Sequence, residues 1–207
     1  MRTEKFLNRE VRPLLMDMRL KGLDLGALEA YLWARHAKER NAQIAKVNPE
    51  MPDGGSGLTN AQVDQYLAGV DVQDDAGEIV IRGLQAEHKP LLEKLAARVD
   101  AIIRGTEEVL LQYGLETRET IEAWRMAYAH YVPLHREDMD SGTPIGTGFS
   151  VKGSASKRAT GSSRKVVDIL AHVALQREAA ITRGEKNRVE RVMNLPRCSR
   201  TARLWAA

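Results

Sequence analysis

AEHKPLLEKLAARVDAIIRGTEEVLLQY, residues 86–113, decides the fold class of this 207-residue chain. Its apolar residues recur every three or four positions, the spacing that places them on one face of an α-helix. Gly114 ends this helix, and Thr117 is a candidate N-cap for the next one, in which we predict Trp124 as a core anchor. The two helices therefore form a predicted helical hairpin. The apolar face of the first consists of Leu91, Leu95, Val99, Ile102, Thr106, Val109 and Tyr113.

Two further helices are predicted before this hairpin. Residues 4–21 carry one apolar stripe, with Pro13 inside it as a kink or a first-turn residue. Gly22 follows as a residue that can adopt the positive φ of a helix C-terminus. Asp24 is then a good N-cap for a helix that runs to about Val47. The N-terminal part of the chain is thus predicted to be helical.

The middle of the helix after Asp24 is polar on every face, and it includes His36 and Glu39. Two potential ligands three residues apart permit a metal site, but a third ligand is not evident nearby. We favour a solvated or interhelical polar contact for this pair. His88, His130 and His135 have no partners at metal or triad spacing, so we expect solvated histidines. No cofactor or metal is predicted.

A loop and a small β-hairpin separate the N-terminal helices from residues 86–113. The loop, NPEMPDGGSGL at 48–58, has three glycines but lacks the Lys-Ser/Thr and the preceding strand of a phosphate-binding loop. Thr59 is predicted to cap a short helix that runs to about Ala68. In residues 70–82, apolar residues at 70, 72 and 79–81 flank the turn-forming DDAG at 74–77, which favours a hairpin. An isolated hairpin is marginally stable, so it must pack on the helices.

Charge is distributed unevenly along the chain, although the net charge is only +3. Residues 141–207 carry 13 Lys/Arg against 4 Asp/Glu, a net charge of +9, and residues 1–140 carry 18 against 24, a net charge of −6. A basic end of this kind suits phosphates or acidic surfaces. The other interpretation is that the acidic part docks on the basic part within the molecule.

The basic end comprises a predicted Gly/Ser/Thr loop at 137–163 and a long basic amphipathic helix at 164–195. Backbone amides and basic side chains of such a loop can contact a phosphate backbone, and a solvated connection is the alternative. The apolar stripe of the helix is too diluted for strong membrane insertion. Our candidate nucleic-acid-binding residues are Lys152, Lys157, Arg158, Arg164, Lys165, Arg177, Arg183, Lys186 and Arg188.

Three stretches of the chain are distinctive: ARHAKERN at 34–41 with PDGGSG at 52–57, YVPLHR at 131–136, and GFSVKG at 148–153 followed by Lys157-Arg158, Ala179 and EKNR at 185–188. They resemble a segment of the very large polyvalent proteins of tailed phages and prophages, which are often named for a Pro-Leu-x-Arg-Phe-Gly motif. The chain has Pro133-Leu134-His135-Arg136 and then departs from that motif, with Glu137-Asp138 in place of Phe-Gly.

This resemblance implies a piece of a much larger protein that is packaged in the virion or delivered with the DNA. It implies helical connecting material, with DNA or other parts of the same protein as partners, and it provides no catalytic residues. After Leu195 the pattern loses its helical period, so 196–207 is predicted to be an irregular tail. A frameshift or truncation in a decaying prophage gene would explain this tail, and resequencing the gene tests that hypothesis.

The composition agrees with a protein made in the host cytoplasm. A single cysteine, Cys198, excludes an internal disulfide and fits a reducing compartment. No apolar run approaches the roughly 18–20 residues that a membrane span needs. The N-terminus has acidic residues and does not read as a signal peptide.

We therefore predict a mainly α protein, an elongated or loosely packed helical assembly with one small β-hairpin and a long Gly/Ser-rich loop before a long C-terminal helix. The predicted regions are an acidic helical region at 1–136, the loop at 137–163, the basic helix at 164–195 and the tail. The leading functional hypothesis is a non-catalytic structural segment of a phage polyvalent or internal virion protein. A nucleic-acid-binding module is the second hypothesis. An enzyme, whose site would have to gather residues far apart in sequence, is the third.

Overall fold

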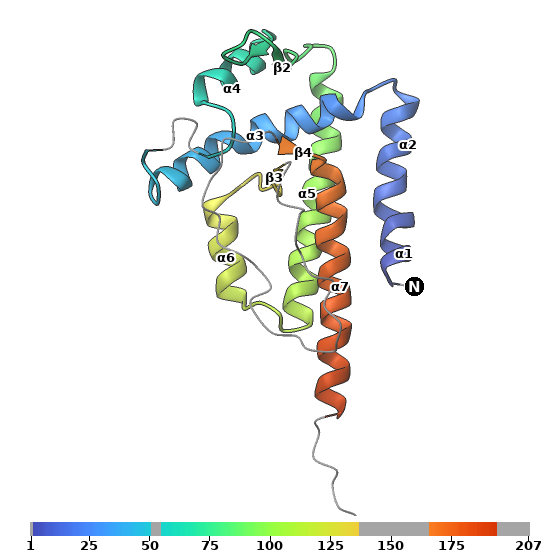
Figure 1. Cartoon of the computed structure of the whole chain (residues 1–207). Coiled ribbons are helices and arrows are strands. Elements are labelled where there is room, and N and C mark those ends of the chain that lie inside the picture. Colours follow the sequence, from blue (N-terminus) through green and yellow to red (C-terminus); the bar gives the residue numbers. More distant parts are fainter. Residues whose placement is uncertain (1, 51–54, 137–165, 194–207) are drawn as a thin grey trace, which may run out of the picture.

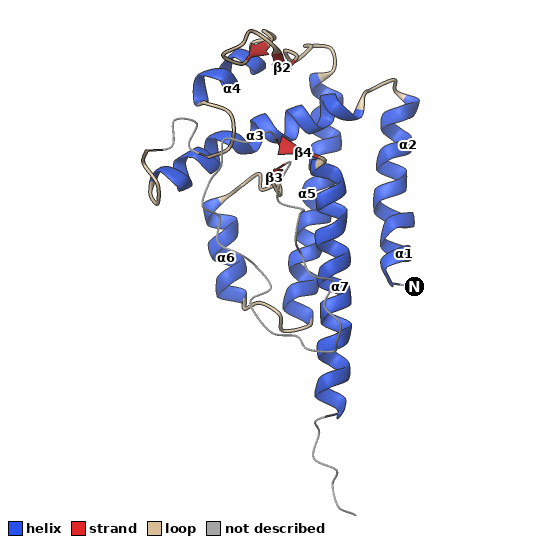
Figure 2. Ribbon diagram, viewed as in Figure 1, coloured by secondary structure: helices blue, strands red, loops and turns tan. Residues whose placement is uncertain are grey.

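The structure is a computed structural model that describes residues 2–50, 55–136 and 166–193. It is mainly helical, with a small antiparallel hairpin and a long C-terminal helix, which confirms the predicted fold class (Figures 1 and 2). The predicted loop at 137–163 and the tail lie outside the described residues. The elements are α1 (Arg2–Phe6), a π-helical turn η1 (Leu7–Val11), α2 (Arg12–Leu20), α3 (Leu25–Ala45), α4 (Asn60–Leu67), β1 (Val72–Gln73), β2 (Ile79–Ile81), α5 (Lys89–Gln112), α6 (Arg118–Ala127), β3 (His135–Arg136), β4 (Val166–Val167) and α7 (Ile169–Met193).

The first helical run is continuous from α1 to α2, and its irregularity lies next to Pro13. Proline has no N–H and its ring crowds the preceding turn, so it is tolerated in a first turn. Pro13 occupies that place in α2, directly after the wider π turn η1. Gly22 ends the run with φ of 68°, as predicted. Phe6, Leu14 and Met18 turn one side of the run into the core.

Helix α3 crosses α5 and carries much of the core (Figure 1). Asp24 caps it by accepting a hydrogen bond from the Gly26 N–H, as predicted. Its polar residues also point inward: the Asn41 side-chain amide donates to the Leu58 carbonyl at 2.8 Å. The Trp33 indole N–H donates to the Ser56 carbonyl at 2.9 Å. Buried polar groups of α3 therefore hold the loop after it in place.

The segment between α3 and α5 has the predicted short helix and hairpin. Thr59 caps α4 in a reciprocal capping box with Gln62. Strands β1 and β2 pair antiparallel, and their paired residues Val72 and Ile81 are buried. The hairpin thus packs on the core, as a two-stranded sheet must to be stable.

Helices α5 and α7 lie side by side and form the long axis of the molecule (Figure 1). Gly184 makes the close approach possible, because a Cβ there would lie 2.3 Å from ring atoms of Tyr113. The Tyr113 hydroxyl donates to Glu185 at 2.6 Å, and Arg2 pairs with the same carboxylate at 2.8 Å. The first helix is therefore fastened to the last one.

The structure differs from the sequence predictions in helix α6 and at the start of helix α7. Trp124 is only half-buried, and Ile121 is the core residue of α6, so the prediction of Trp124 as a core anchor was wrong. Helix α7 begins at Ile169 rather than 164, because Val166 pairs with Arg136 in the β3–β4 ladder and Asp168 has a φ of 49°.

Candidate functional site

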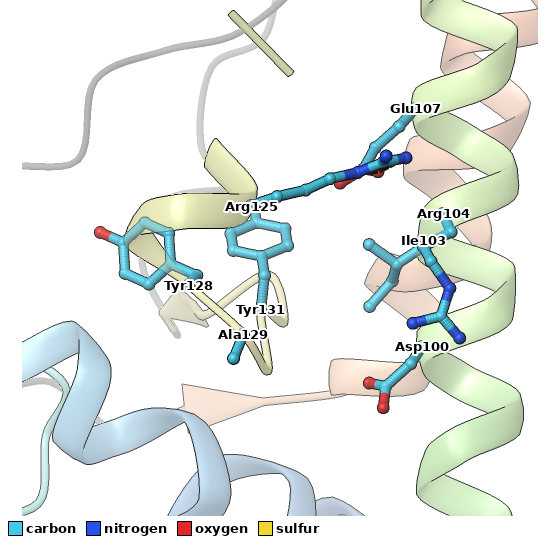
Figure 3. Close-up of a pocket in the computed structure, with 8 residues that line it drawn as sticks. All are labelled: Asp100, Ile103, Arg104, Glu107, Arg125, Tyr128, Ala129 and Tyr131. Carbon is cyan, nitrogen blue, oxygen red and sulfur yellow. Dashed lines mark hydrogen bonds and ion pairs between the residues drawn. The ribbon is translucent and has the colours of Figure 1, made fainter. Parts of the chain in front are cut away.

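A pocket lies where α5 faces α6 and the segment that follows α6. Its volume is about 260 Å³. Figure 3 shows tyrosine rings on one wall and α5 side chains on the other. It is the candidate site because aromatic faces and several charged groups meet in it. The lining residues are Asp100, Ile103, Arg104, Glu107, Arg125, Tyr128, Ala129 and Tyr131.

Both carboxylates of the pocket are bound by arginines from other helices. Asp100 accepts two hydrogen bonds from the Arg35 guanidinium, at 2.5 and 3.0 Å, and each of these side chains is 17% exposed. Glu107 Oε2 of α5 accepts a hydrogen bond from Arg125 Nε of α6 at 2.8 Å and lies 2.7 Å from Arg125 Nη2. The Arg35–Asp100 pair is bidentate, which fixes geometry as well as charge. These contacts tie α3 to α5 and α5 to α6.

His36 lies behind the tyrosine wall and is fully buried. Its ring centroid is 5.2 Å from that of Tyr128 and 5.7 Å from that of Tyr131. Neither ring nitrogen has a hydrogen-bond partner of ordinary geometry in the described part of the chain, although the nearby His130 backbone favours the protonated ring. The expectation of a solvated side chain was therefore wrong for His36, because its ring is buried and packs on two tyrosine rings.

Burial lowers the pKa of His36 from 6.5 to about 3, with smaller contributions in the same direction from the Arg40, Arg35 and His130 charges. The backbone of His130 acts weakly in the opposite direction. The ring is therefore neutral at physiological pH. With that pKa it is a poor general base at neutral pH, since efficient proton transfer needs a pKa near the working pH.

Glu39, the second residue of the predicted His-Glu pair, contacts His130 instead of His36. Its carboxylate lies 2.7 Å from His130 Nδ1 and accepts the His130 backbone N–H at 3.0 Å. His130 is thus engaged rather than solvated, which corrects the expectation for this histidine. Across residues 2–50, 55–136 and 166–193, no group of three His, Cys, Asp or Glu side chains is arranged to hold a metal ion.

The predicted nucleic-acid-binding residues do not gather at this pocket. Arg177 points inward from α7: its guanidinium lies 5.5 Å from the Phe6 ring centroid, and its Nε and Nη1 are buried. Arg183 is half-buried, Lys186 is exposed, and Arg188 pairs with Glu185 at 3.0 Å. The remaining candidates, Lys152, Lys157, Arg158, Arg164 and Lys165, lie outside the described residues.

The residues of the pocket were missed by sequence reasoning. One available signal was the unusually polar middle of α3, because polar residues on a buried helix need partners. A second was the pair Tyr128 and Tyr131 directly after α6, where the chain leaves the helix. Neither signal says which distant residues would complete the site, since Arg35 and Asp100 are 65 positions apart.

Chemically, the pocket offers aromatic faces and hydrogen-bond donors. The Arg104 guanidinium is exposed and has no ion pair in the part of the chain described by the structure. The Tyr131 hydroxyl accepts a long hydrogen bond of 3.4 Å from Gln176, and burial raises its pKa. Asp100 and Glu107 are each neutralised by an arginine from another helix. The two carboxylates therefore link helices rather than offering a free reactive group.

Comparison of the chain with protein-family models, with curated proteins and with solved structures found no match. Among the described helices, none combines the length and the apolar character that crossing a membrane requires.

Proposed function

We propose that the chain is a non-catalytic helical structural segment of a phage or prophage polyvalent or internal virion protein. One observation carries the proposal: both carboxylates of the pocket between α5 and α6 are paired with arginines of other helices. Arg35 holds Asp100, and Arg125 holds Glu107, so the pairs link α3, α5 and α6. Side chains used in this way fix the relative positions of helices.

Two further features support a structural role over an enzymatic one. His36, the one fully buried histidine among the described residues, has a pKa of about 3 and faces aromatic rings. The Tyr113–Glu185–Arg2 contacts fasten the first helix to the last one. Both features serve a fixed arrangement of helices. The phage context comes from the resemblance of three stretches, including YVPLHR at 131–136.

In this proposal the chain is made in the host cytoplasm and is then packaged inside the virion. DNA or other parts of the same large protein are its partners there. A helical segment of this kind would separate or connect the modules of the larger protein.

Particle association tests this proposal. The prophage in the strain that encodes the chain would be induced, and the particles purified and treated with protease and nuclease from outside. We expect tryptic peptides of the chain in the protected fraction by mass spectrometry, together with those of the major capsid protein. Peptides found in the cell lysate and missing from protected particles would contradict a virion role, provided that capsid peptides are recovered.

A further inference from the structure

The outward side of the first helical run, α1–η1–α2, is basic. Positions that recur every three or four residues lie on one side of a helix. Along this side lie four exposed cations, none of which has an ion pair or a hydrogen bond among the described residues. We call it the N-terminal basic face, and it consists of Lys5, Arg9, Arg12 and Arg19 with the exposed apolar residues Met16 and Leu20.

The acidic residues of this run lie away from the face. Asp17 points toward α5, where it pairs with Arg98 at 2.9 Å, and it also lies 3.9 Å from Lys21. Glu10 is half-buried near Arg177 of α7. Glu4, which is exposed, lies roughly 100° around the helix from Lys5, because a helix turns by that angle at each residue. The positive charge of the face is therefore left without neutralising carboxylates on the same side.

The rest of the run explains why this side stays outward. Phe6, Leu14 and Met18 are 4%, 1% and 6% exposed and pack into the core on the opposite side. Figure 1 shows α1 and α2 at the edge of the molecule beside α7. Met16 and Leu20, by contrast, are 63% and 81% exposed. The core contacts thus fix the rotation of the run and keep its arginines in solvent.

The spacing of the cations suits a row of phosphates. From Lys5 to Arg19 the face extends about 21 Å, at 1.5 Å per residue. A strand of duplex DNA presents about six phosphates over that length, at 3.4 Å each along the axis. Three of the four cations are arginines, whose planar guanidinium groups bind phosphate oxygens in pairs.

We propose that the N-terminal basic face binds the phosphate backbone of a nucleic acid. Arg9 and Arg12 are its centre, and Met16 and Leu20 lie beside the cations where they can contact sugars and base edges. The run exposes three large apolar residues, Leu15, Met16 and Leu20, all in α2, and these are too few to anchor an amphipathic helix in a membrane. This inference goes beyond the structural role proposed above, and it assigns binding to a different surface from the C-terminal residues that the charge distribution indicated.

The test measures binding of the full chain to labelled duplex and single-stranded DNA of about 20 nucleotides by fluorescence anisotropy, at about 50 and 200 mM salt. The variant carries Arg9→Gln, Arg12→Gln and Arg19→Gln. Its matched control carries Arg82→Gln, Lys89→Gln and Lys94→Gln, the same change in net charge at exposed positions elsewhere. A third variant changes Lys152, Lys157, Arg158, Arg164 and Lys165 to Gln.

We expect the first variant to bind about tenfold or more weakly at low salt, with a salt-dependence slope reduced by about 3, one for each phosphate contact removed. The matched control should bind like the unchanged chain. Unchanged binding by the first variant, an equal loss in the control, a loss confined to the third variant, or no binding at low salt would each overturn the proposal. Circular dichroism of each variant confirms that it is folded. Particle association is measured separately, so failure here leaves the structural proposal standing.

Discussion

Two regions of the molecule hold charged side chains in opposite ways. At the junction of α3, α5 and α6, Arg35 and Arg125 are bound to carboxylates of α5. On the N-terminal basic face, Arg9 and Arg12 are exposed and have no such partners among the described residues. The difference separates two uses of an arginine: one bound to a carboxylate of another helix stabilises the fold, and an exposed unpaired one is available to a ligand. Charge changes in the two regions should therefore have different effects.

The largest expected effect in the junction comes from acid. The folded pKa of His36, about 3, lies below the 6.5 of the unfolded chain, so the unfolded state takes up a proton first as the pH falls. Stability from this residue is complete above pH 6.5 and is lost between pH 6.5 and 3, by about 1.4 kcal/mol per pH unit, which gives about 2 kcal/mol at pH 5 and about 4 kcal/mol at pH 3.5. Thermal unfolding at pH 7, pH 5 and pH 3.5 measures the loss. His36→Phe keeps an aromatic ring and should remove most of the difference. An equal loss in both proteins would contradict this assignment.

The next effect concerns the ion pairs of the junction. Asp100→Asn leaves the Arg35 guanidinium facing a neutral amide in a site where both side chains are 17% exposed. We expect a loss of about 2–3 kcal/mol in the free energy of unfolding. Asp64→Asn is the matched control, because it breaks a pair with Lys38 in which the side chains are 65% and 45% exposed. The control should cost less than about 1 kcal/mol. Urea unfolding measures both, and equal losses would show that burial does not distinguish the pairs.

A smaller effect, of opposite sign, is expected at Arg177. Its Nε and Nη1 are buried without hydrogen-bond partners among the described residues, and its side chain packs on Phe6. Arg177→Met keeps most of the apolar contact and removes a poorly solvated charge, so stability should rise by up to about 1 kcal/mol. Thermal unfolding measures the change, with Arg9→Met as the exposed control. A clear loss of stability in the Arg177 variant would contradict this prediction, because it would show that the guanidinium charge stabilises the fold.

The smallest effect is expected on the N-terminal basic face itself. The combined Arg9→Gln, Arg12→Gln and Arg19→Gln variant should unfold within about 0.5 kcal/mol of the unchanged chain, as exposed surface substitutions usually do. Urea unfolding beside the Asp100→Asn protein completes the comparison. Should the triple variant be destabilised as strongly as that protein, the two regions would not differ in the way proposed.

The ends of the helices could be predicted from sequence because local chemistry determines them. Asp24, Thr59 and Thr117 each accept a backbone N–H within three residues, and Gly22 and Gly114 adopt the positive φ that ends a helix. A capping residue and its partner are close in the chain, so the pattern contains the whole interaction.

The pocket and the basic face could not be predicted, because they depend on which way each helix is turned. The rings of Tyr128 and Tyr131 contact His36, although more than 90 residues separate them from it in the sequence. The net charge of +9 in residues 141–207 predicted a binding surface at the C-terminal end. Arg177 of that region instead packs inward against the Phe6 ring. The first 140 residues have a net negative charge, so their composition gave no sign of the row of unpaired arginines on η1 and α2.

The contact between the first and last helices has a consequence during synthesis. Arg2 meets Glu185 and Tyr113, so α1 completes its packing only when α7 is present. Ribosomes add roughly 5–20 residues per second, and the interval between residues 20 and 185 therefore lasts roughly 10–30 s. During that time Phe6 and the apolar stripe behind it lack their final cover. The chain is therefore expected to need protection by chaperones until α7 emerges, and a stalled or shortened product would expose the same stripe permanently.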